Sequence, residues 1–156
     1  MLTTSDKKFK QGIFIPKNKE KWINCQKNMS IRFLSSWEHK FLTWADNNSS
    51  VLLVGSECLP IPYPHPFKKK MTIYLPDIYM KVQEQNGEIK QYVIEIKPSK
   101  ETIKPTQVNG NRKKRSTIIY EQATYTINIC KWTAAQKYCE KNGIIFKLVT
   151  EKDIRI

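Results

Sequence analysis

The most constraining part of the sequence is the stretch from Tyr74 to Lys97, in which two apolar β-type runs flank a polar turn. The first run begins after the pair Pro76-Asp77, and the second contains Glu95 two positions before Lys97. Because strand side chains alternate between the two faces of a sheet, Glu95 and Lys97 point the same way. The stretch therefore predicts a β-hairpin with charged groups on one face, and we expect the chain to fold around it.

The turn of this hairpin decides whether Asp77 shares the face of Glu95. A two-residue loop, Asn86-Gly87, would place Asp77 opposite Ile96 and separate the two carboxylates. A three-residue loop, Gln85 to Gly87, has Gly87 in the left-handed conformation of a type I turn plus bulge and places Asp77 opposite Glu95. We favour this second register, and a bulge elsewhere in the hairpin would have the same effect.

Paired carboxylates on a strand face predict a divalent metal site. Two carboxylates a few Å apart repel each other unless a cation lies between them, and Mg²⁺ or Mn²⁺ takes oxygen ligands from carboxylates, waters and substrate phosphate. Lys97 would orient an attacking water or offset charge on the phosphate. The alternative is a solvated sheet edge with a surface ion pair. The apolar neighbours Ile94 and Ile96 favour the metal site, because a charge buried in an apolar run is costly without a partner.

A helix is predicted from Ser35 to Asp46, where apolar residues recur at steps of three and four. Ser35 and Glu38 have the spacing of a capping box, in which the glutamate reaches back to the start of the helix. Alternatively, Glu38 extends toward Asp77 and adds a third carboxylate to the metal site. The two roles compete for one side chain. Glu57, after an apolar run, is a fourth and weaker candidate acid.

Charge and composition indicate the kind of partner. The chain has 156 residues, enough for one domain, and a formal net charge of +13. This charge favours a polyanion, first a nucleic acid, with a membrane surface as the competing interpretation. No stretch approaches the roughly 18 apolar residues of a membrane span, so we expect a soluble, unexported protein. The four cysteines form no CxxC pair, which argues against a zinc site. We expect no small-molecule cofactor.

The remaining segments are predicted from local patterns. Residues 1–29 are rich in lysine without a sustained period, which predicts an extended basic arm before a domain of residues 30–156. A strand is expected from Val51 to Val54, then an extended segment to Tyr63 and a loop to Lys70. Two helices are expected, about Lys113–Ile127 and Lys131–Lys141 with a cap near Asn128, before a last strand, Ile144–Val149.

Basic residues near these elements are candidates for contact with a DNA backbone, in a binding mode largely independent of base sequence. They are Lys68, Lys69, Lys70, Arg112, Lys113, Lys114, Arg115 and Lys131. A run of lysines is also typical of a solvated turn. Tyr74, Tyr79 and Trp132 are candidates for stacking on an unpaired DNA end, although core packing explains them as well.

The order helix, strand, strand, strand, helix, strand, with Glu38, Pro76-Asp77 and Glu95-Ile96-Lys97, resembles the PD-(D/E)xK nuclease superfamily. Further stretches resemble the head completion protein family of T4-like tailed phages and, more distantly, TnsA-type transposon endonucleases. These stretches are Ser36-Trp37-Glu38, Gly55-Ser56-Glu57, Ile61-Pro62-Tyr63, Asp77 to Lys81, Ile94 to Pro98, Lys131 to Gln136 and Leu148 to Glu151.

The resemblance implies a single-domain α/β protein with a restriction-endonuclease-like αβββαβ core. It implies a metal held by Asp77, Glu95 and the Ile96 carbonyl, with Glu38 as a further ligand and Lys97 as the catalytic lysine. It also implies a phage role on packaged DNA or at portal and neck proteins before tail attachment. We therefore expect the protein in the host cytoplasm during assembly and then in the virion, either as a nuclease or as a catalytically silent adaptor that binds DNA or portal and neck proteins.

Overall fold

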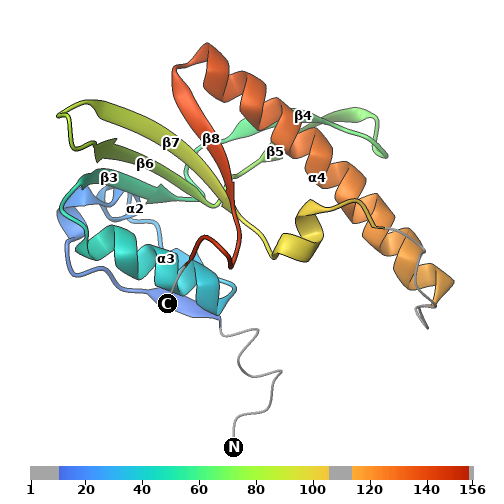
Figure 1. Ribbon diagram of the computed structural model, residues 1–156, viewed down its shortest axis with the longest axis horizontal. Helices are drawn as coiled ribbons and strands as arrows, with labels where there is room; N and C mark the ends of the chain where they lie inside the picture. The colour runs from blue at the N-terminus through green and yellow to red at the C-terminus, as the bar shows by residue number, and fades with distance from the viewer. Residues whose placement is uncertain (1–10, 106–113, 155–156) are drawn as a thin grey trace, which may run out of the picture.

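The computed structural model describes residues 11–105 and 114–154, and its centre is a four-stranded sheet (Figure 1). The strand order is β3 (Val51–Ser56), β6 (Ile78–Gln83), β7 (Ile89–Ile96) and β8 (Ile144–Val149). The first three strands are antiparallel neighbours, and β8 runs parallel to β7. With helices α3 (Ser36–Asn47) and α4 (Arg115–Lys141), the order α3, β3, β6, β7, α4, β8 confirms the predicted αβββαβ core.

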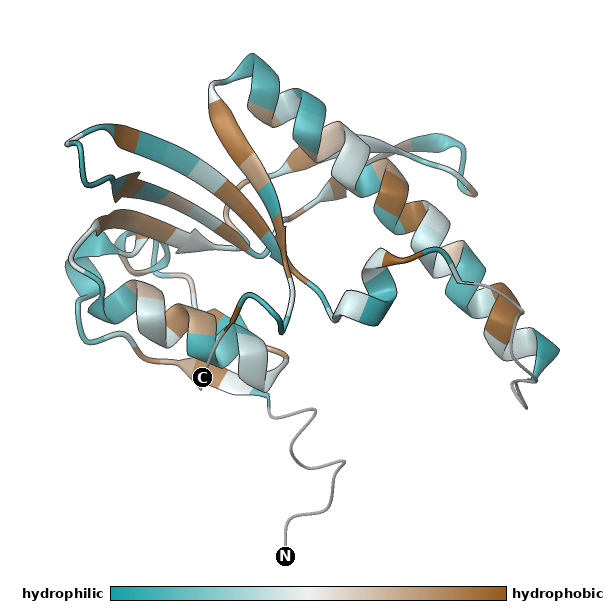
Figure 2. Ribbon diagram, in the orientation of Figure 1, coloured by the Kyte–Doolittle hydropathy of each residue, from teal (hydrophilic) through white to brown (hydrophobic). Residues whose placement is uncertain are grey.

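The two helices cover the sheet through two apolar clusters. Phe41, Leu42 and Ala45 of α3 pack in one cluster with residues of β6 and β7. Trp132 and Ala135 of α4 pack in the other, against residues of β8. Figure 2 shows apolar residues along the central strands and polar residues at the turn between β6 and β7. Within the described ranges, no helix is both long and apolar enough to cross a bilayer.

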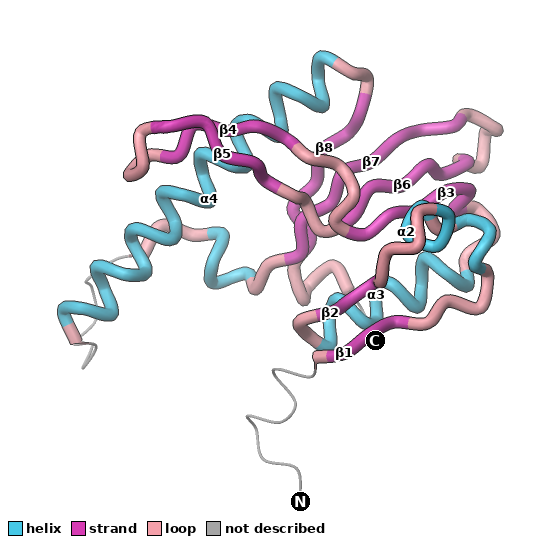
Figure 3. Tube along the Cα trace, turned by 180° about the vertical axis from the view of Figure 1, so that it is seen from behind, coloured by secondary structure: helices cyan, strands magenta, loops and turns pink. Residues whose placement is uncertain are grey.

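A second hairpin lies beside α4, where the sequence predicted an extended segment and a loop. Strands β4 (Ile61–His65) and β5 (Lys70–Tyr74) pair with each other and contact α4, as the rear view in Figure 3 shows. The predicted loop to Lys70 is therefore wrong in part, because β4 extends to His65. Pro62 and Pro64 are tolerated because residues two apart direct their backbone N–H to the same edge, and β4 has a single partner strand.

The N-terminal segment differs from the predicted extended arm wherever the structure describes it. Strands β1 (Gly12–Phe14) and β2 (Ile31–Phe33) pair with each other, and the short helices η1 (Lys19–Lys21) and α2 (Ile23–Gln26) lie between them. Trp22 is completely buried and donates its indole N–H to Asp46 Oδ1 at 3.0 Å. These elements are too short to produce a sustained period in the sequence. Residues 1–10 lie outside the described residues.

Helix α4 is a single helix of 27 residues, so the prediction of two helices with a cap near Asn128 is wrong. Asn128 is buried in the middle of α4 instead. Asparagine favours caps and turns, but no glycine or proline interrupts the helix, and tertiary packing outweighs so weak a preference. For Tyr74 and Trp132, the core alternative holds and the stacking alternative does not, because both residues are buried.

Candidate active site

The turn between β6 and β7 places Asp77 and Glu95 side by side. Gly87 has a left-handed φ of 89°, and the Glu84 N–H donates to the Glu88 carbonyl at 2.7 Å. The loop therefore has the predicted three-residue form. The paired part of the hairpin ends with Ile78 opposite Ile94. Continued by one residue, the same register puts Asp77 opposite Glu95, as predicted.

Each of the two carboxylates accepts a backbone hydrogen bond from the opposite segment of the hairpin. Asp77 Oδ2 accepts from the Ile96 N–H at 2.8 Å, and Glu95 Oε2 accepts from the Asp77 N–H at 3.3 Å. Burial, followed by the negative charge of Glu95, raises the pKa of Asp77 well above its usual value. Burial also raises the pKa of Glu95, although Lys97 and Tyr74 oppose that shift. Glu95 is buried and Asp77 is half-buried, and two such neighbouring carboxylates disfavour each other's charge, which favours binding of a cation between them.

The carboxylate of Glu95 is held by two further side chains. Lys97 Nζ lies 3.6 Å from Glu95 Oε1, and the Tyr74 hydroxyl donates to Glu95 Oε2 at 2.6 Å. Helix α4 brings Lys131 to the same region, with Nζ 5.5 Å from the ring centre of Tyr74 and 5.8 Å from that of Tyr63. Burial lowers the pKa of Lys131, and the charge of Glu95 opposes this shift. Both ammonium groups thus neighbour one carboxylate.

Glu38 is close to this site but acts as a capping residue. The Glu38 N–H donates to Ser35 Oγ at 3.1 Å, and Glu38 Oε2 accepts from the Leu34 N–H at 3.0 Å. Burial raises the pKa of Glu38, and the charges of Glu57 and Glu95 raise it further. In the described ranges 11–105 and 114–154, no three acids, histidines or cysteines are arranged to hold a metal ion. The structure therefore brings Asp77, Glu95 and Lys97 together and leaves Glu38 at the wall of the site.

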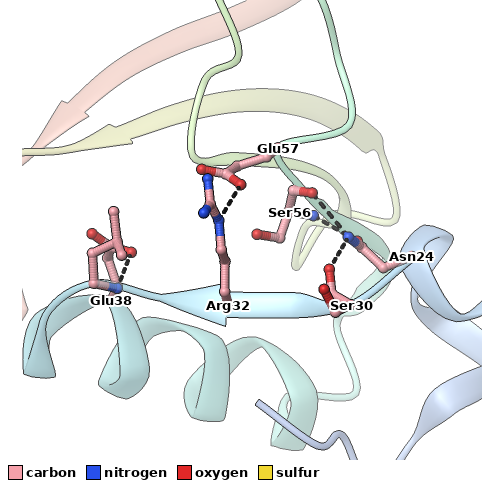
Figure 4. Close-up of polar contacts among 7 residues, drawn as sticks. Asn24, Ser30, Arg32, Glu38, Ser56 and Glu57 are labelled. Atoms are coloured by element: carbon pink, nitrogen blue, oxygen red, sulfur yellow. Dashed lines mark hydrogen bonds and ion pairs between the residues drawn. The ribbon is translucent and has the colours of Figure 1, made fainter. Parts of the chain in front are cut away.

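A small cleft connects these acids to the end of β3. Its lining residues are Arg32, Glu38, Leu42, Ser56, Glu57, Asp77, Ile78 and Ile96. Figure 4 shows Arg32 between Glu38 and Glu57, and Arg32 Nε lies 3.2 Å from Glu57 Oε2. Arg32 was missed from the sequence because no element was predicted between the arm of residues 1–29 and the helix that begins at Ser35. The available signal was its position between two apolar residues, Ile31 and Phe33, which alternate with it as in a strand.

The predicted DNA-binding residues fall in separate places. Lys68, Lys69 and Lys70 are exposed at and beside the turn of the β4–β5 hairpin. Lys114 and Arg115 are exposed at the start of α4. Arg112 and Lys113 lie outside the described residues. Lys131 is set apart from both groups by its place next to the carboxylates.

Comparison with known proteins gives the family to which this fold and site belong. Residues 48–151 match the family described as TnsA-like endonuclease N terminal, and this range contains β3, both hairpins, α4 and β8. The chain belongs to this endonuclease family, within the PD-(D/E)xK superfamily.

A second comparison finds a relative that matches along nearly the whole chain. The chain is 38% identical over 147 residues to the head completion nuclease of Enterobacteria phage T4, and the match covers 92% of this chain and 93% of the relative. The similarity therefore extends beyond the endonuclease core to elements before β3.

Proposed function

We propose that this protein is a phage head completion nuclease that hydrolyses DNA phosphodiesters in a reaction dependent on Mg²⁺ or Mn²⁺. The observation that carries the proposal is the neighbouring pair of half-buried Asp77 and buried Glu95, with Lys97 beside it, on a TnsA-like endonuclease fold. Such a pair is costly in a protein core unless it serves a cation or a reaction. The expected place of action is the end of packaged DNA or the head–tail connector.

The donor set fits a hard divalent cation. Asp77 and Glu95 supply carboxylate oxygens, the Ile96 carbonyl is a neighbouring backbone oxygen, and Mg²⁺ takes few protein ligands and completes its shell with water and phosphate. Glu38 would join as a further ligand after its carboxylate leaves the Leu34 N–H. When bound, the metal supplies a water of lowered pKa and polarises a phosphoryl oxygen.

The chain's own groups have separate roles in the proposed reaction. Lys97, within 3.6 Å of Glu95, positions the attacking water and offsets charge that develops on the phosphate. Tyr74 fixes the Glu95 carboxylate through its hydroxyl. The hydrogen bond from the Ile96 N–H fixes one Asp77 oxygen. The site is therefore largely preorganised before substrate arrives.

DNA would be held through its phosphates. The candidates are the exposed lysines of the β4–β5 turn (Lys68, Lys69 and Lys70), Lys114 and Arg115 at the start of α4, Lys131, and Arg112 and Lys113, which lie outside the described residues. Contacts of this kind give affinity with little sequence preference and a steep dependence on salt. The net charge of +13 agrees with such a partner.

A second candidate function is that of a structural adaptor without catalysis. The observation that favours it is the capping role of Glu38, since no group of three ligands is assembled among the residues described. In that case the protein would bind DNA or the portal and neck proteins in the virion through its basic surface. Both functions place the protein in the host cytoplasm during assembly and afterwards in the head or neck.

A cleavage assay with a matched lysine control tests the proposal. Linear and supercoiled DNA are incubated with the protein in Mg²⁺, in Mn²⁺ and with a chelator. We expect cleavage only with metal, loss of cleavage in Lys97→Ala, and normal cleavage in Lys90→Ala, which removes an exposed lysine near the far end of the same strand. Cleavage by wild type that Lys97→Ala abolishes contradicts the adaptor. DNA binding without cleavage in any metal contradicts the nuclease.

A further inference from the structure

Arg32 has an unusual position for a residue outside the endonuclease core. It lies on β2 between the buried residues Ile31 and Phe33, so strand alternation directs its side chain away from the core. The side chain reaches the cleft that Asp77 also lines, yet it stays 59% exposed. A cation is thereby presented to solvent at the mouth of the candidate active site.

Glu57, the partner of Arg32, is in a strained backbone conformation. Its φ of 50° lies in the left-handed region, which costs a residue other than glycine on the order of 1 kcal/mol or more. Such strain persists only where neighbouring contacts enforce it. The Glu57 N–H donates to the Asp77 carbonyl at 3.1 Å, which connects the strained residue directly to a candidate metal ligand.

The residue before Glu57 is fixed equally firmly. The buried Asn24 side chain accepts from the Ser56 N–H at 2.8 Å and donates to the Ser56 carbonyl at 2.9 Å (Figure 4). Asn24 on one side and Asp77 on the other thus set the backbone of Glu57. An exposed ion pair by itself contributes only about 0–1 kcal/mol, which does not explain so much enforcement. These hydrogen bonds fix the position of Glu57, and the Glu57 carboxylate in turn holds Arg32 through Nε.

The contact with Glu57 leaves most of the guanidinium group available. Glu57 accepts from Nε at 3.2 Å, and among the described residues no hydrogen bond engages the terminal nitrogens of Arg32. These two nitrogens form a planar fork that matches two oxygens of a phosphate. The Glu57 carboxylate, bonded to Nε, fixes the plane of that fork. Binding a phosphate then costs less side-chain conformational entropy, because the Arg32 side chain is already ordered.

We propose that Arg32 binds a phosphate of the DNA strand that enters the cleft, and that Glu57 is a positioning residue that holds the guanidinium group for this contact. The inference rests on the proposed function and assigns its site a phosphate-binding residue outside the metal-binding set. It places β2, which precedes the matched endonuclease domain, in the binding surface.

The test separates DNA binding from cleavage. Affinity for a short duplex is measured over a range of salt concentrations, without divalent metal, in a Lys97→Ala background. Each phosphate contact to duplex DNA contributes about 0.9 to the slope of log K against log salt. We expect Arg32→Ala to lower the slope by about 0.9 and to weaken binding roughly tenfold at low salt. Glu57→Gln keeps the slope, because it removes only the group that orients Arg32.

Three comparisons make the result decisive. Lys90→Ala removes the same charge outside the cleft and leaves the slope unchanged, and Arg32→Gln replaces Arg32→Ala if thermal unfolding shows that the alanine variant is misfolded. Arg32→Lys keeps the slope but not the full affinity, since an ammonium group lacks the fork. If Arg32→Ala or Arg32→Gln has the same slope of log K against log salt as Lys90→Ala, the inference is overturned, even if the wild-type protein cleaves DNA. A lowered slope in a protein that never cleaves overturns the proposed function and leaves the inference standing.

Discussion

Tyr74 donates its hydroxyl hydrogen to Glu95 Oε2 across 2.6 Å and so connects the β4–β5 hairpin to the central sheet. Tyr74 is 4% exposed, and burial together with the charge of Glu95 raises the pKa of its hydroxyl far above the usual value. The hydroxyl therefore stays protonated and remains a donor. The position of the candidate metal ligand depends in this way on a strand outside the four-stranded sheet.

Tyr74→Phe removes this donor while it keeps the ring in place. We expect a loss of stability of about 1–3 kcal/mol, because a charged acceptor loses a buried partner, and cleavage that requires more metal. Chemical denaturation and cleavage rates over a metal series check both effects. Tyr92→Phe is the matched control. The Tyr92 hydroxyl donates to Glu84 Oε1 over 2.5 Å, and this hydrogen bond lies outside the candidate site. Equal metal requirements in the two variants would contradict the role of Tyr74.

Asp77→Asn should make the metal-free protein more stable while abolishing cleavage. Burial and the charge of Glu95 raise the pKa of Asp77, so the folded protein holds this proton to higher pH than the unfolded chain. The carboxyl therefore favours folding at low pH, and this contribution is lost as pH rises from the usual value through the raised one. Asparagine does not titrate, so the Asp77→Asn variant does not lose this stability as pH rises. We expect a higher melting temperature at neutral pH, by about 2–4 °C for each kcal/mol, and a smaller difference in acid.

Asp46→Asn should have the opposite effect on stability. Burial acts to raise the pKa of Asp46, but hydrogen bonds from the Trp22 indole and the Lys17 and Asn18 backbone outweigh it and lower the pKa. The stabilisation is present above the unfolded pKa and is lost as pH falls through the lower folded value. We expect a loss of about 1–3 kcal/mol at neutral pH that shrinks in acid, measured by denaturation. An unchanged midpoint at neutral pH would contradict this explanation.

Glu38→Gln and Ser35→Ala together separate capping from metal binding. Glutamine keeps an oxygen for the Leu34 N–H but removes the charge, so we expect near-normal stability and a large loss of cleavage. Ser35→Ala removes the hydroxyl that accepts from the Glu38 N–H, which costs about 0.5–2 kcal/mol and leaves cleavage by the folded protein intact. Thermal melting and cleavage at low temperature measure the two effects. Full activity in Glu38→Gln would restrict Glu38 to its cap.

Replacing Lys68, Lys69 and Lys70 together with alanine should weaken DNA binding without changing the fold. The three side chains are exposed, so we expect an unchanged melting temperature. If all three contact phosphates, the salt slope falls by about 2.7, that is, about 0.9 for each contact. Fluorescence anisotropy of a labelled duplex over a salt series gives the slope. A slope equal to that of wild type would show that these lysines form only a solvated turn.

The parts of the fold that the sequence predicted are those with strong local signals. Gly87 fixes the turn and therefore the register of Asp77 and Glu95, because a left-handed residue is needed at one position of the loop. The Ser35 cap marks the start of α3, and the structure begins that helix at Ser36. The mainly apolar run from Ile144 to Val149, interrupted by Lys147, defines β8 with the predicted bounds.

The parts that were missed depend on contacts between distant segments. Trp22 is a core residue through contacts with distant segments: Asp46 accepts its indole hydrogen, and Phe14 packs on its ring. Likewise, the position of Arg32 in the cleft depends on Glu57, which lies 25 residues further along the chain. No local period carries such information. For the candidate site, sequence patterns predicted that Asp77, Glu95 and Lys97 lie together, whereas the groups that orient them became visible only in three dimensions.

The uninterrupted course of α4 sets a fixed span across the protein. At a rise of 1.5 Å per residue, Lys131 lies about 24 Å along the helix axis from Arg115, 16 positions earlier. Two helices with a hinge at Asn128 would have allowed the basic end to swing, whereas one rod keeps it at a constant distance from the carboxylates. If Lys131 and Arg115 both contact one duplex, the fixed length of α4 sets the distance between the two contacts. That distance corresponds to roughly seven base pairs between the candidate active site and the start of α4.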